Sequence, residues 1–326
     1  MEQINFDGQA AIVTGAGSGI GRVIAMELAQ RGARVLVNDY GGDTYGKGGS
    51  SQRAEAVTAE IRSAGGVAAA NSIAVGTADS ARAIAAAALS AFGRIDILVN
   101  NAGITLPGPI AESSDDSVDN HFSVNLLGPY ALVRAVWPHM RNQGYGRILN
   151  TTSNAALGIG YNAPYGTTKA GLIGLTLDAA LEGKSLGIFV NGFMPVAGTR
   201  MIDQIPDSRF VDWMRSNFPP ASVAAAMVYF LSKESAITGH ILSTGGGRLA
   251  RLAFTEGRGI VDRQISAERL RPRIDEALSL AGATALLSQA DEMACYFAEF
   301  STAENPAPIL DHEAVKGAGP KPAADC

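Results

Sequence analysis

Short apolar runs alternate along most of the chain with longer stretches in which apolar residues recur at helical spacing. The short runs predict seven strands, at residues 10–13, 34–38, 67–70, 95–99, 146–150, 188–191 and 240–243. The longer stretches predict six helices, at 19–31, 51–64, 79–92, 115–141, 165–181 and 223–231. Strands that alternate with helices predict a Rossmann-type α/β fold, with a doubly wound, parallel, seven-stranded sheet.

Three segments depart from this alternation. Residues 41–50 hold five glycines and predict a loop inserted after the second strand. Residues 196–220 are too long for a simple connection and predict a lid. We therefore divide the chain into an α/β domain at 1–247, a C-terminal helical extension at 248–300 and a flexible tail at 301–326 that is rich in Ala, Pro, Lys and Gly.

Composition limits the classes of protein to consider. The 326 residues are 47% hydrophobic and 17% charged, which predicts a sizeable core. A net charge of −5 gives no basic footprint, so we expect no nucleic-acid partner. The two cysteines, Cys295 and Cys326, make no disulfide framework and fit a reducing compartment. Residues 1–7 are polar and no apolar run is long enough to span a bilayer, so we expect a cytoplasmic protein without a membrane span.

A glycine-rich turn, TGAGSGIG at 14–21, joins the first predicted strand to the first helix. A turn without side chains lets the backbone approach a pyrophosphate, and a helix N-terminus supplies N–H donors and positive potential. An ordinary tight turn is the alternative, but the position at the first strand–helix junction favours a dinucleotide. The candidate cofactor-binding residues of this turn are Gly15, Gly17, Ser18, Gly19, Ile20 and Gly21.

Asp39 follows the second predicted strand, about twenty residues after the glycines. A carboxylate there accepts hydrogen bonds from the adenosine ribose and repels a 2′-phosphate. No Arg or Lys lies beside Asp39 in the sequence or between Gly15 and Gly21. The sequence therefore predicts NAD rather than NADP as cofactor. The alternative is that Asp39 caps the loop that follows it.

Tyr165 and Lys169 lie four residues apart, on one face of a predicted helix. A phenol with a pKa of about 10 is a poor base at neutral pH, and a nearby cation lowers that pKa. A solvated helix face is the alternative explanation of the pair. Ser153 favours the catalytic one, because it follows the strand predicted at 146–150, where its hydroxyl is placed to bind an alcohol or a carbonyl. No metal ligand is predicted.

Together these residues resemble the classical short-chain dehydrogenase/reductase family over about residues 5–245. The stretch 14–21 matches the TGxxxGIG cofactor motif of that family, and NNAG at 100–103 matches a second motif. The tetrad of the family matches Asn125, Ser153, Tyr165 and Lys169 in order. The conjunction of these motifs is highly specific.

The resemblance implies a role for each residue of the site. Tyr165 takes the hydroxyl proton as hydride leaves for the nicotinamide, and Lys169 lowers the Tyr165 pKa and binds the nicotinamide ribose. Ser153 holds the substrate oxygen, and Asn125 positions a water that leads protons to solvent. Thr199 lies where the family binds the nicotinamide carboxamide. The resemblance adds to the cofactor site the residues Ala74, Val75, Asn101, Ala102, Gly103 and Pro195.

Two positions depart from the pattern of the family. Ala74 stands where the family commonly has an Asp near the adenine, which costs one hydrogen bond and affects affinity. Val196 replaces a glycine that often follows the proline after the sixth strand. The branch that this chain most resembles, namely the dehydrogenase units of peroxisomal multifunctional enzymes type 2 and related bacterial 17β-hydroxysteroid dehydrogenases, also lacks that glycine. The carriers of this narrower likeness are VNDYGGD at 37–43, FGRID at 92–96 and AGTRM at 197–201.

The narrower likeness implies the first of two further features, and the likeness to the family implies the second. The extension at 248–300 packs back on the α/β domain. The helices at 115–141 and 165–181 form the interface of a homo-oligomer, a dimer or a tetramer.

The expected function is NAD-dependent oxidation of a secondary alcohol on a bulky apolar substrate. The predicted lid carries acids that offset its arginines, so the sequence slightly favours a 17β-hydroxysteroid over the alternative, a (3R)-hydroxyacyl-CoA. A non-catalytic NAD-binding regulator and a structural subunit are the alternatives of another class. Ordinary packing of a short helix is the alternative to the lid, whose apolar residues are Met201, Ile202, Ile205, Phe210, Val211, Trp213, Met214 and Phe218.

Overall fold

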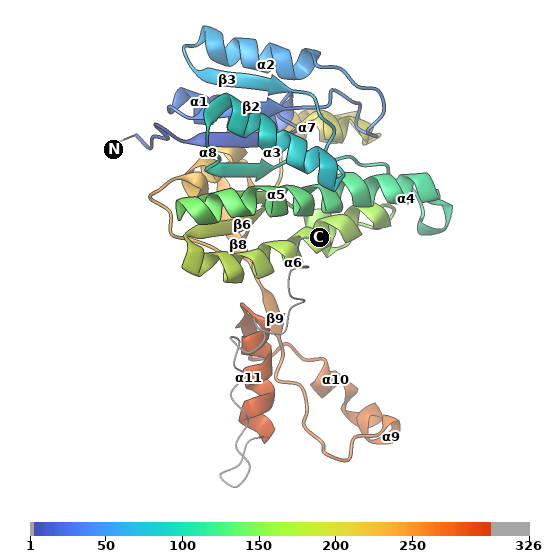
Figure 1. The fold of residues 1–326 in the computed structure, drawn as a ribbon. Helices are drawn as coiled ribbons and strands as arrows, with labels where there is room; N and C mark the ends of the chain where they lie inside the picture. Colours follow the sequence, from blue (N-terminus) through green and yellow to red (C-terminus); the bar gives the residue numbers. More distant parts are fainter. Residues whose placement is uncertain (1–2, 301–326) are drawn as a thin grey trace, which may run out of the picture. The chain divides into compact units, whose positions relative to one another are not determined.

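The computed structural model describes residues 3–300 and confirms a mostly parallel, doubly wound α/β sheet (Figure 1). The sheet has eight strands in the order β3-β2-β1-β4-β5-β6-β7-β8, and the direction of winding reverses between β1 and β4. All neighbouring pairs are parallel except β7 with β8. The strands are β1 Ala10–Thr14, β2 Arg34–Asn38, β3 Val67–Asn71, β4 Ile97–Asn100, β5 Gly146–Thr151, β6 Ile188–Pro195, β7 Ile241–Gly245 and β8 Arg248–Leu252.

The eighth strand is the first difference from the sequence-based expectation of seven strands and of a domain that ends at residue 247. Gly246 and Gly247 both have positive φ, +56° and +83°, as a type I′ hairpin turn requires. This turn brings β8 back along β7 in antiparallel register, from Gly245 opposite Arg248 to Ile241 opposite Leu252. The Gly-Gly pair was the hairpin signal in the sequence.

Helices cover both faces of the sheet. On one face, α1, α2 and α8 pack over alternate strand residues such as Val13 and Val35. On the other face, α3, α5 and α6 pack over the intervening residues such as Ile12 and Leu36. Both faces are therefore buried, as expected for parallel strands. These helices are α1 Gly19–Gln30, α2 Gln52–Ser63, α3 Ala78–Phe92, α5 Gly128–Gln143, α6 Ala163–Gly183 and α8 Pro220–Leu231.

The helix predicted at 115–141 is interrupted. The structure has α4 Asp115–Phe122, then a π-helical turn, η2 Ser123–Leu127, and then α5. Pro129 explains the break, because proline has no N–H to give to the carbonyl four residues earlier and its ring crowds that carbonyl. The carbonyl in question belongs to Asn125, a candidate site residue.

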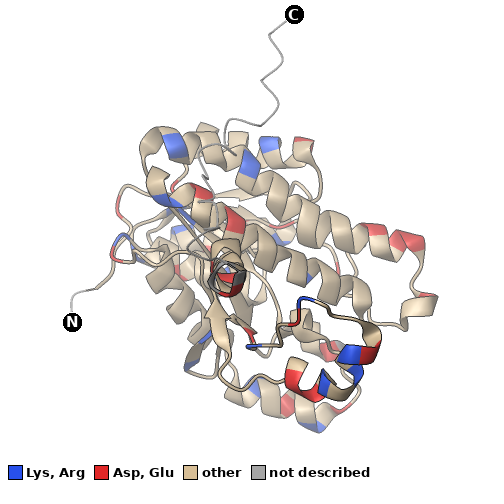
Figure 2. Cartoon of the chain, turned by 90° about the horizontal axis from the view of Figure 1, so that it is seen from below, with Lys and Arg blue, Asp and Glu red and all other residues tan. Residues whose placement is uncertain are grey.

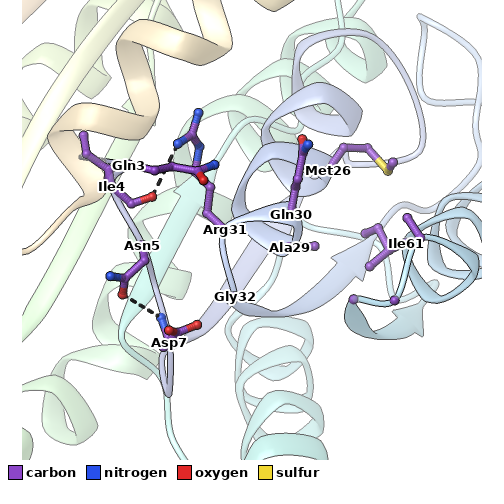
Figure 3. A pocket seen from close by; sticks show the side chains of 13 residues that line it. Gln3, Ile4, Asn5, Asp7, Met26, Ala29, Gln30, Arg31, Gly32 and Ile61 are labelled. Carbon is purple, nitrogen blue, oxygen red and sulfur yellow. Dashed lines mark hydrogen bonds between the residues drawn. The ribbon is translucent and has the colours of Figure 1, made fainter. Parts of the chain in front are cut away.

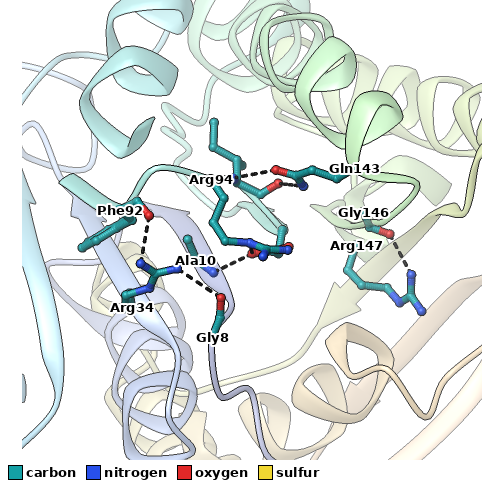
Figure 4. A network of polar contacts seen from close by, with 10 residues as sticks. Gly8, Ala10, Arg34, Phe92, Arg94, Gln143, Gly146 and Arg147 are labelled. Carbon is teal, nitrogen blue, oxygen red and sulfur yellow. Dashed lines mark hydrogen bonds and ion pairs between the residues drawn. The ribbon is translucent and has the colours of Figure 1, made fainter. Parts of the chain in front are cut away.

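Polar contacts link the segments at the amino ends of the strands, which we call the amino edge of the sheet (Figure 4). The buried carboxylate of Asp96 accepts the Ala10 N–H at 2.8 Å and two bonds from Arg94, at 2.6 and 2.7 Å. The Arg34 guanidinium donates to the carbonyls of Phe92 and Gly8 at 2.8 and 3.1 Å. These bonds satisfy charged and backbone groups that would otherwise be costly to bury.

A cavity of about 650 Å³ also lies near this edge, between the N-terminal segment and the ends of α1 and α2 (Figure 3). Arg31 crosses it to the Ile4 carbonyl at 3.3 Å, and Asn5 accepts the Asp7 N–H at 3.4 Å. None of the predicted site residues lines this cavity.

The chain divides into two compact units, Met1–Leu252 and Ala253–Cys326. The described part of the second unit combines short helices with an antiparallel pair in which Phe254 faces Leu286. The extension is therefore partly β, and its packing against the first unit stays a prediction. The tail at 301–326 lies outside the described residues. The elements in the described part of the second unit are β9 Phe254–Glu256, α9 Ala267–Leu270, η6 Arg271–Arg273, α10 Ile274–Ala277, β10 Thr284–Leu286 and α11 Gln289–Phe300.

Within residues 3–300, no helix combines the length and the apolar content needed to cross a membrane. In the view of Figure 2, Lys and Arg positions are interspersed with Asp and Glu positions along the ribbon. The absence of a nucleic-acid partner and the cytoplasmic location stay predictions.

Candidate active site

The candidate site residues follow the carboxyl ends of the strands. Because these strands are parallel, the chain leaves every one of them at the same edge of the sheet. Asp39 follows β2, Asn101 follows β4, Ser153 lies two residues after β5, and Pro195 ends β6. In doubly wound sheets this edge, at the point where the winding reverses, is where ligands bind.

The glycine-rich turn after β1 is held by the loop after β4. The Thr14 hydroxyl donates to the Val99 carbonyl at 3.2 Å and accepts the N–H groups of Asn101 and Ala102 at 3.0 and 3.1 Å. The Asn101 amide donates to the carbonyls of Thr14 and Gly15 at 2.9 and 3.2 Å. Asn101, predicted to bind the cofactor, thus uses its side chain to hold the turn in shape.

The turn has the features of an anion-binding cradle. Gly19 has φ +55°, which L-residues seldom adopt. Helix α1 begins after Ser18, whose hydroxyl makes no cap bond, so the first N–H groups of the helix have no side-chain acceptor. A Cβ on Gly21 would lie 2.4 Å from the Asn101 amide nitrogen, and Ile20 packs against the core. The backbone of this turn therefore fits the pyrophosphate of a dinucleotide.

The contacts of Asp39 fit both roles that the sequence left open, namely binding the adenosine ribose and capping the loop that follows. Its Oδ2 accepts the N–H of Gly17 at 2.8 Å, in the glycine-rich turn, and its Oδ1 accepts the N–H of Gly41 at 2.7 Å, as a loop cap does. A Cβ on Gly17 would come within 2.7 Å of this carboxylate, so the turn and the carboxylate require each other. A carboxylate has about four acceptor positions, so Asp39 keeps capacity for ribose hydroxyls.

Two arginines that are distant in sequence lie near this carboxylate. Arg53 on α2 and Arg200 after β6 both donate to the carbonyl of Gly42, at 2.8 and 3.1 Å. Although no Arg or Lys lies beside Asp39 in the sequence, the fold therefore places two arginines near it. Only the fold brings these cations together, because 158 positions separate Gly42 from Arg200.

A cavity of about 500 Å³ extends from the glycine-rich turn past Asp39. Ala74 lines it without a polar side chain, as expected from the missing Asp. The nearby Asn38 amide is engaged, since it donates to the Asn71 side chain and to the Ile73 carbonyl at 2.7 and 2.9 Å. Predicted cofactor residues that line the cavity are Gly15, Asp39, Ala74, Val75, Ala102 and Gly103.

Ser153 and Tyr165 meet at this edge. Ser153 precedes a 3₁₀ turn, η3 Asn154–Leu157, and its hydroxyl accepts the N–H of Ala155 at 3.1 Å. Tyr165 lies in the first turn of α6. Burial raises the Tyr165 pKa above its ordinary value, and a hydrogen bond with the Ser153 side chain opposes that rise. The Ser153 and Tyr165 side chains are therefore neighbours at this edge.

Lys169 is buried on the same helix. Its ammonium donates to the Thr151 carbonyl, at the end of β5, at 2.6 Å, and it lies 5.8 Å from the centroid of the Tyr165 ring. Burial lowers the Lys169 pKa from 10.5 to about 8. The role that the resemblance gives to Lys169, lowering the Tyr165 pKa, stays a prediction.

Asn125 is fully buried in the π-helical turn. Its side-chain oxygen accepts the Ile104 N–H at 2.8 Å and its amide donates to the Ile104 carbonyl at 2.9 Å. A Cβ on Gly103 would lie 3.3 Å from the Asn125 oxygen and 3.5 Å from the Lys169 nitrogen. The structure thus brings Asn125 next to Lys169 around Gly103, with its side chain engaged by the loop after β4. A role in placing a water stays a prediction.

The predicted lid contains a short 3₁₀ helix, η5 Arg200–Gln204, and α7 Ser208–Asn217. Thr199 precedes η5, and a Cβ on Gly19 would lie 3.3 Å from the Thr199 methyl group, so this part of the predicted lid lies beside the glycine-rich turn. Val211 and Met214 are buried, whereas Phe210 and Trp213 stay 42% and 52% exposed. One face of α7 therefore packs as an ordinary helix, and the other presents aromatic side chains.

Sequence reasoning missed residues that act through long-range contacts. Thr14 is part of the matched cofactor motif, so the sequence could have predicted its role. No motif in the sequence includes His121. The His121 ring is buried, its Nδ1 lies 2.7 Å from the Ser117 carbonyl, and its Nε2 accepts the Leu106 N–H at 3.2 Å. Within residues 3–300, no group of three or more His, Cys, Asp and Glu is placed to hold a metal ion.

Comparison with known proteins places this site in a family. A family model described as short chain dehydrogenase matches residues 9–209. A putative short-chain type dehydrogenase/reductase of Mycobacterium tuberculosis is 39% identical over 83% of this chain and 94% of that protein. The peroxisomal multifunctional enzyme A of Dictyostelium discoideum is 36% identical over 82% of this chain, and the peroxisomal hydratase-dehydrogenase-epimerase of Neurospora crassa is 38% identical over 80%. The chain spans 59% and 28% of the lengths of these last two relatives.

Solved structures agree. A short chain dehydrogenase from Mycobacterium avium aligns with a TM-score of 0.72 at 36% identity, over 83% of this chain and 95% of that one. A 7α-hydroxysteroid dehydrogenase, complexed with NADH and 7-oxo glycochenodeoxycholic acid, aligns with a TM-score of 0.67 at 30% identity, over 74% and 95%. With the glycine-rich turn, Ser153, Tyr165 and Lys169 at one edge of a doubly wound sheet, the chain belongs to the short-chain dehydrogenase family and is an oxidoreductase.

Proposed function

We propose that the chain oxidises the secondary alcohol of a 3-hydroxyacyl thioester, with NAD as acceptor and Tyr165 as general base. The observation that carries the proposal is the convergence of Ser153, Tyr165 and a buried Lys169 beside the glycine-rich turn. When bound, the nicotinamide cofactor accepts the hydride from the alcohol carbon. A NADH-bound structural relative supports the choice of NAD(H).

The residues of the site would divide the remaining work. The Tyr165 oxygen takes the hydroxyl proton, and Ser153 holds the substrate oxygen and keeps the Tyr165 pKa from rising further. Lys169, whose ammonium is held by the Thr151 carbonyl, faces the Asn125 side of the site, where it would bind the nicotinamide ribose. Thr199, whose methyl group lies beside Gly19, would bind the nicotinamide carboxamide.

The relatives support the thioester over the hydroxysteroid, reversing the order that the sequence favoured. A hydratase adds water across a double bond and so makes an alcohol, which a dehydrogenase in the same chain would oxidise next. The Neurospora crassa relative is named for both activities. A hydroxysteroid remains the second candidate, supported by the 7α-hydroxysteroid dehydrogenase structure. The exposed aromatic side chains of Phe210 and Trp213 suit either apolar body.

One assay tests both reaction and substrate. NADH formation is followed from a (3R)-hydroxyacyl-CoA, estradiol and testosterone, with the unmodified protein, Tyr165→Phe and the control Tyr130→Phe, which changes an exposed tyrosine on α5. We expect turnover of the thioester, a loss of about 100-fold or more in Tyr165→Phe and no change in Tyr130→Phe. Turnover of the steroids alone would move the proposal to the second candidate. NADH binding without turnover of any alcohol would indicate a regulator.

A homo-oligomer and a cytoplasmic location complete the proposal. The exposed apolar side chain of Leu181 on α6, which is 61% exposed, supports self-association. Two of the relatives are named as peroxisomal, so the location stays a prediction that imaging of the tagged protein would test.

A further inference from the structure

Thr105 lies in the loop after β4 and forms hydrogen bonds to both sides of the candidate site. Its backbone N–H donates to the Thr44 carbonyl at 2.9 Å, in the glycine-rich insert at 41–50. Its hydroxyl accepts the side-chain amide of Asn162 at 2.9 Å. Thr105 and Asn162 are 8% and 5% exposed, so the bond between their side chains is shielded from water. One residue therefore links the insert after β2 with the residue that precedes α6.

The Thr44 end of this link lies beside the cofactor cleft. In the sheet, β1 separates β2 from β4, so the insert must span the carboxyl end of β1, where the glycine-rich turn lies, to reach the loop after β4. The 500 Å³ cavity is lined by Gly15 of the turn, Gly46 of the insert and Ile104 of the loop. A Cβ on Gly46 would lie 3.3 Å from the Ile104 side chain. A dinucleotide in the cavity would therefore contact the two segments that the Thr44–Thr105 bond joins.

The Asn162 end of the link holds the start of α6. Asn162 directly precedes the helix, and its carbonyl accepts the Gly166 N–H at 3.0 Å, around the turn that carries Tyr165. Within residues 3–300, Tyr161 is the one non-glycine residue with a positive φ, +58°. This conformation is strained, and the Gly108 N–H bonds to the Tyr161 carbonyl at 2.7 Å. Contacts with the loop after β4 therefore hold the backbone that leads into the turn of Tyr165.

The Asn162 side chain depends on Thr105 for its position. Its Oδ1 atom is buried and has no hydrogen-bond partner among the described residues, so the bond to Thr105 is the one that its amide makes there. Losing that bond would leave a buried amide with no partner, which is costly. The loop in turn is fixed, because the Asn125 side chain bonds to the N–H and the carbonyl of Ile104 at 2.8 and 2.9 Å.

We propose that Thr105 is a positioning residue that couples the cofactor cleft, through Asn162, to the first turn of α6 and so places the Tyr165 hydroxyl. A dinucleotide in the cleft holds the insert against the loop after β4, which keeps the Thr105 hydroxyl in reach of Asn162. Placement matters, because an error of about 1 Å in a reacting group costs about 100-fold in rate. Thr105 does not line the cavity, so it acts through Asn162 rather than on the substrate. The inference rests on the proposed role of Tyr165 as general base.

Amide hydrogen exchange and kinetics on the full chain test the link. Exchange of the segment 161–168 is measured with and without NADH, and kcat and KM are measured with a (3R)-hydroxyacyl-CoA. Thr105→Val removes the hydroxyl but keeps the N–H that bonds to Thr44, Thr105→Ser keeps both, and Asn162→Leu removes the amide. Thr58→Val is the matched control, because the Thr58 hydroxyl is buried on α2 without a hydrogen-bond partner among the described residues.

In the unmodified protein and in Thr58→Val, we expect NADH to slow exchange in 161–168 by about fivefold or more. Thr105→Val and Asn162→Leu should lose most of this protection and lower kcat by about tenfold or more, while the NADH dissociation constant changes by less than about threefold. Thr105→Ser should keep kcat within about threefold of the unmodified protein, since its hydroxyl still accepts the amide. Retained NADH binding also shows that the variants fold.

Protection by NADH that persists in Thr105→Val would overturn the coupling, and so would a kcat that stays within about threefold of the unmodified value. A loss of kcat that Thr105→Ser shares would also overturn it, because the hydroxyl would not be the cause. If Thr105→Val does not bind NADH, Asn162→Leu decides, since it removes the same bond. Failure of the unmodified protein to oxidise any alcohol overturns the proposed function, whereas the exchange data still decide the coupling.

Discussion

Replacing Lys169 by methionine removes an ammonium group from one of the most enclosed positions in the chain. Lys169 is 3% exposed, and burial lowers its pKa from 10.5 to about 8. One pKa unit corresponds to 1.36 kcal/mol. The shift of about 2.5 units therefore means that burying the charged form costs the folded state about 3 kcal/mol at neutral pH.

The cost depends on pH in a direction that follows from linkage. Below pH 8 both folded and unfolded chains carry the charge, so the full cost is present. Between pH 8 and 10.5 the folded chain loses the proton first, and the cost fades; above 10.5 it is absent. Relative to Lys169→Met, the unmodified protein should thus gain about 2.5 kcal/mol between pH 7 and pH 10.

Urea unfolding of both proteins at pH 7 and pH 10 measures this difference, and subtracting one protein from the other cancels groups that they share. The methionine leaves the Thr151 carbonyl without its donor, which costs about 1–3 kcal/mol at every pH, so the change with pH is the informative quantity. Lys184→Met, at an exposed lysine just beyond α6, is the matched control. A stability difference that does not change between pH 7 and pH 10 would refute the reasoning, because it would show that the ammonium is not desolvated.

Three further predictions concern neighbouring residues. Ser153→Ala removes the hydrogen bond that opposes the rise of the Tyr165 pKa, so the alkaline rise of kcat/KM for oxidation should move to higher pH when measured from pH 6 to 10; an unmoved profile would contradict this role. Asn101→Ala frees the glycine-rich turn and should weaken NADH binding about tenfold by fluorescence titration. His121→Phe removes the acceptor of the Leu106 N–H and should raise KM for the alcohol more than it lowers kcat; equal effects on both would argue against a role in holding the loop.

The strands and the carboxyl edge could be predicted because the signals are local. A run such as Arg34–Asn38 is apolar, short and bounded by polar residues, and β2 has the predicted bounds. Parallel pairing then fixes the rest of the edge: once β2 and β4 are known, Asp39 and Asn101 must lie at the same end. Periodicity and topology together were enough to gather the predicted site residues at one place.

The features that the sequence did not predict depend on contacts between residues that are distant in the chain or on local backbone chemistry. The π-helical turn at Asn125 depends on the missing N–H of Pro129, which periodicity does not register. The approach of Arg200 to Gly42 depends on how the chain returns after β6. Each of these is a property of space around a residue, and sequence spacing does not determine it.

The charged side chains at the two edges of the sheet differ in the partners that they have. At the amino edge, the buried Asp96 carboxylate is bonded to Arg94 and to the backbone, so its charge is compensated. At the carboxyl edge, Lys169 is buried with a carbonyl as its partner rather than an acid, and Arg53 and Arg200 share one acceptor. A buried charge without an acidic partner lowers stability, yet such groups are the ones whose pKa values are shifted at functional sites. The parallel sheet therefore separates the paired carboxylate of Asp96, at its amino edge, from the buried ammonium of Lys169, at its carboxyl edge.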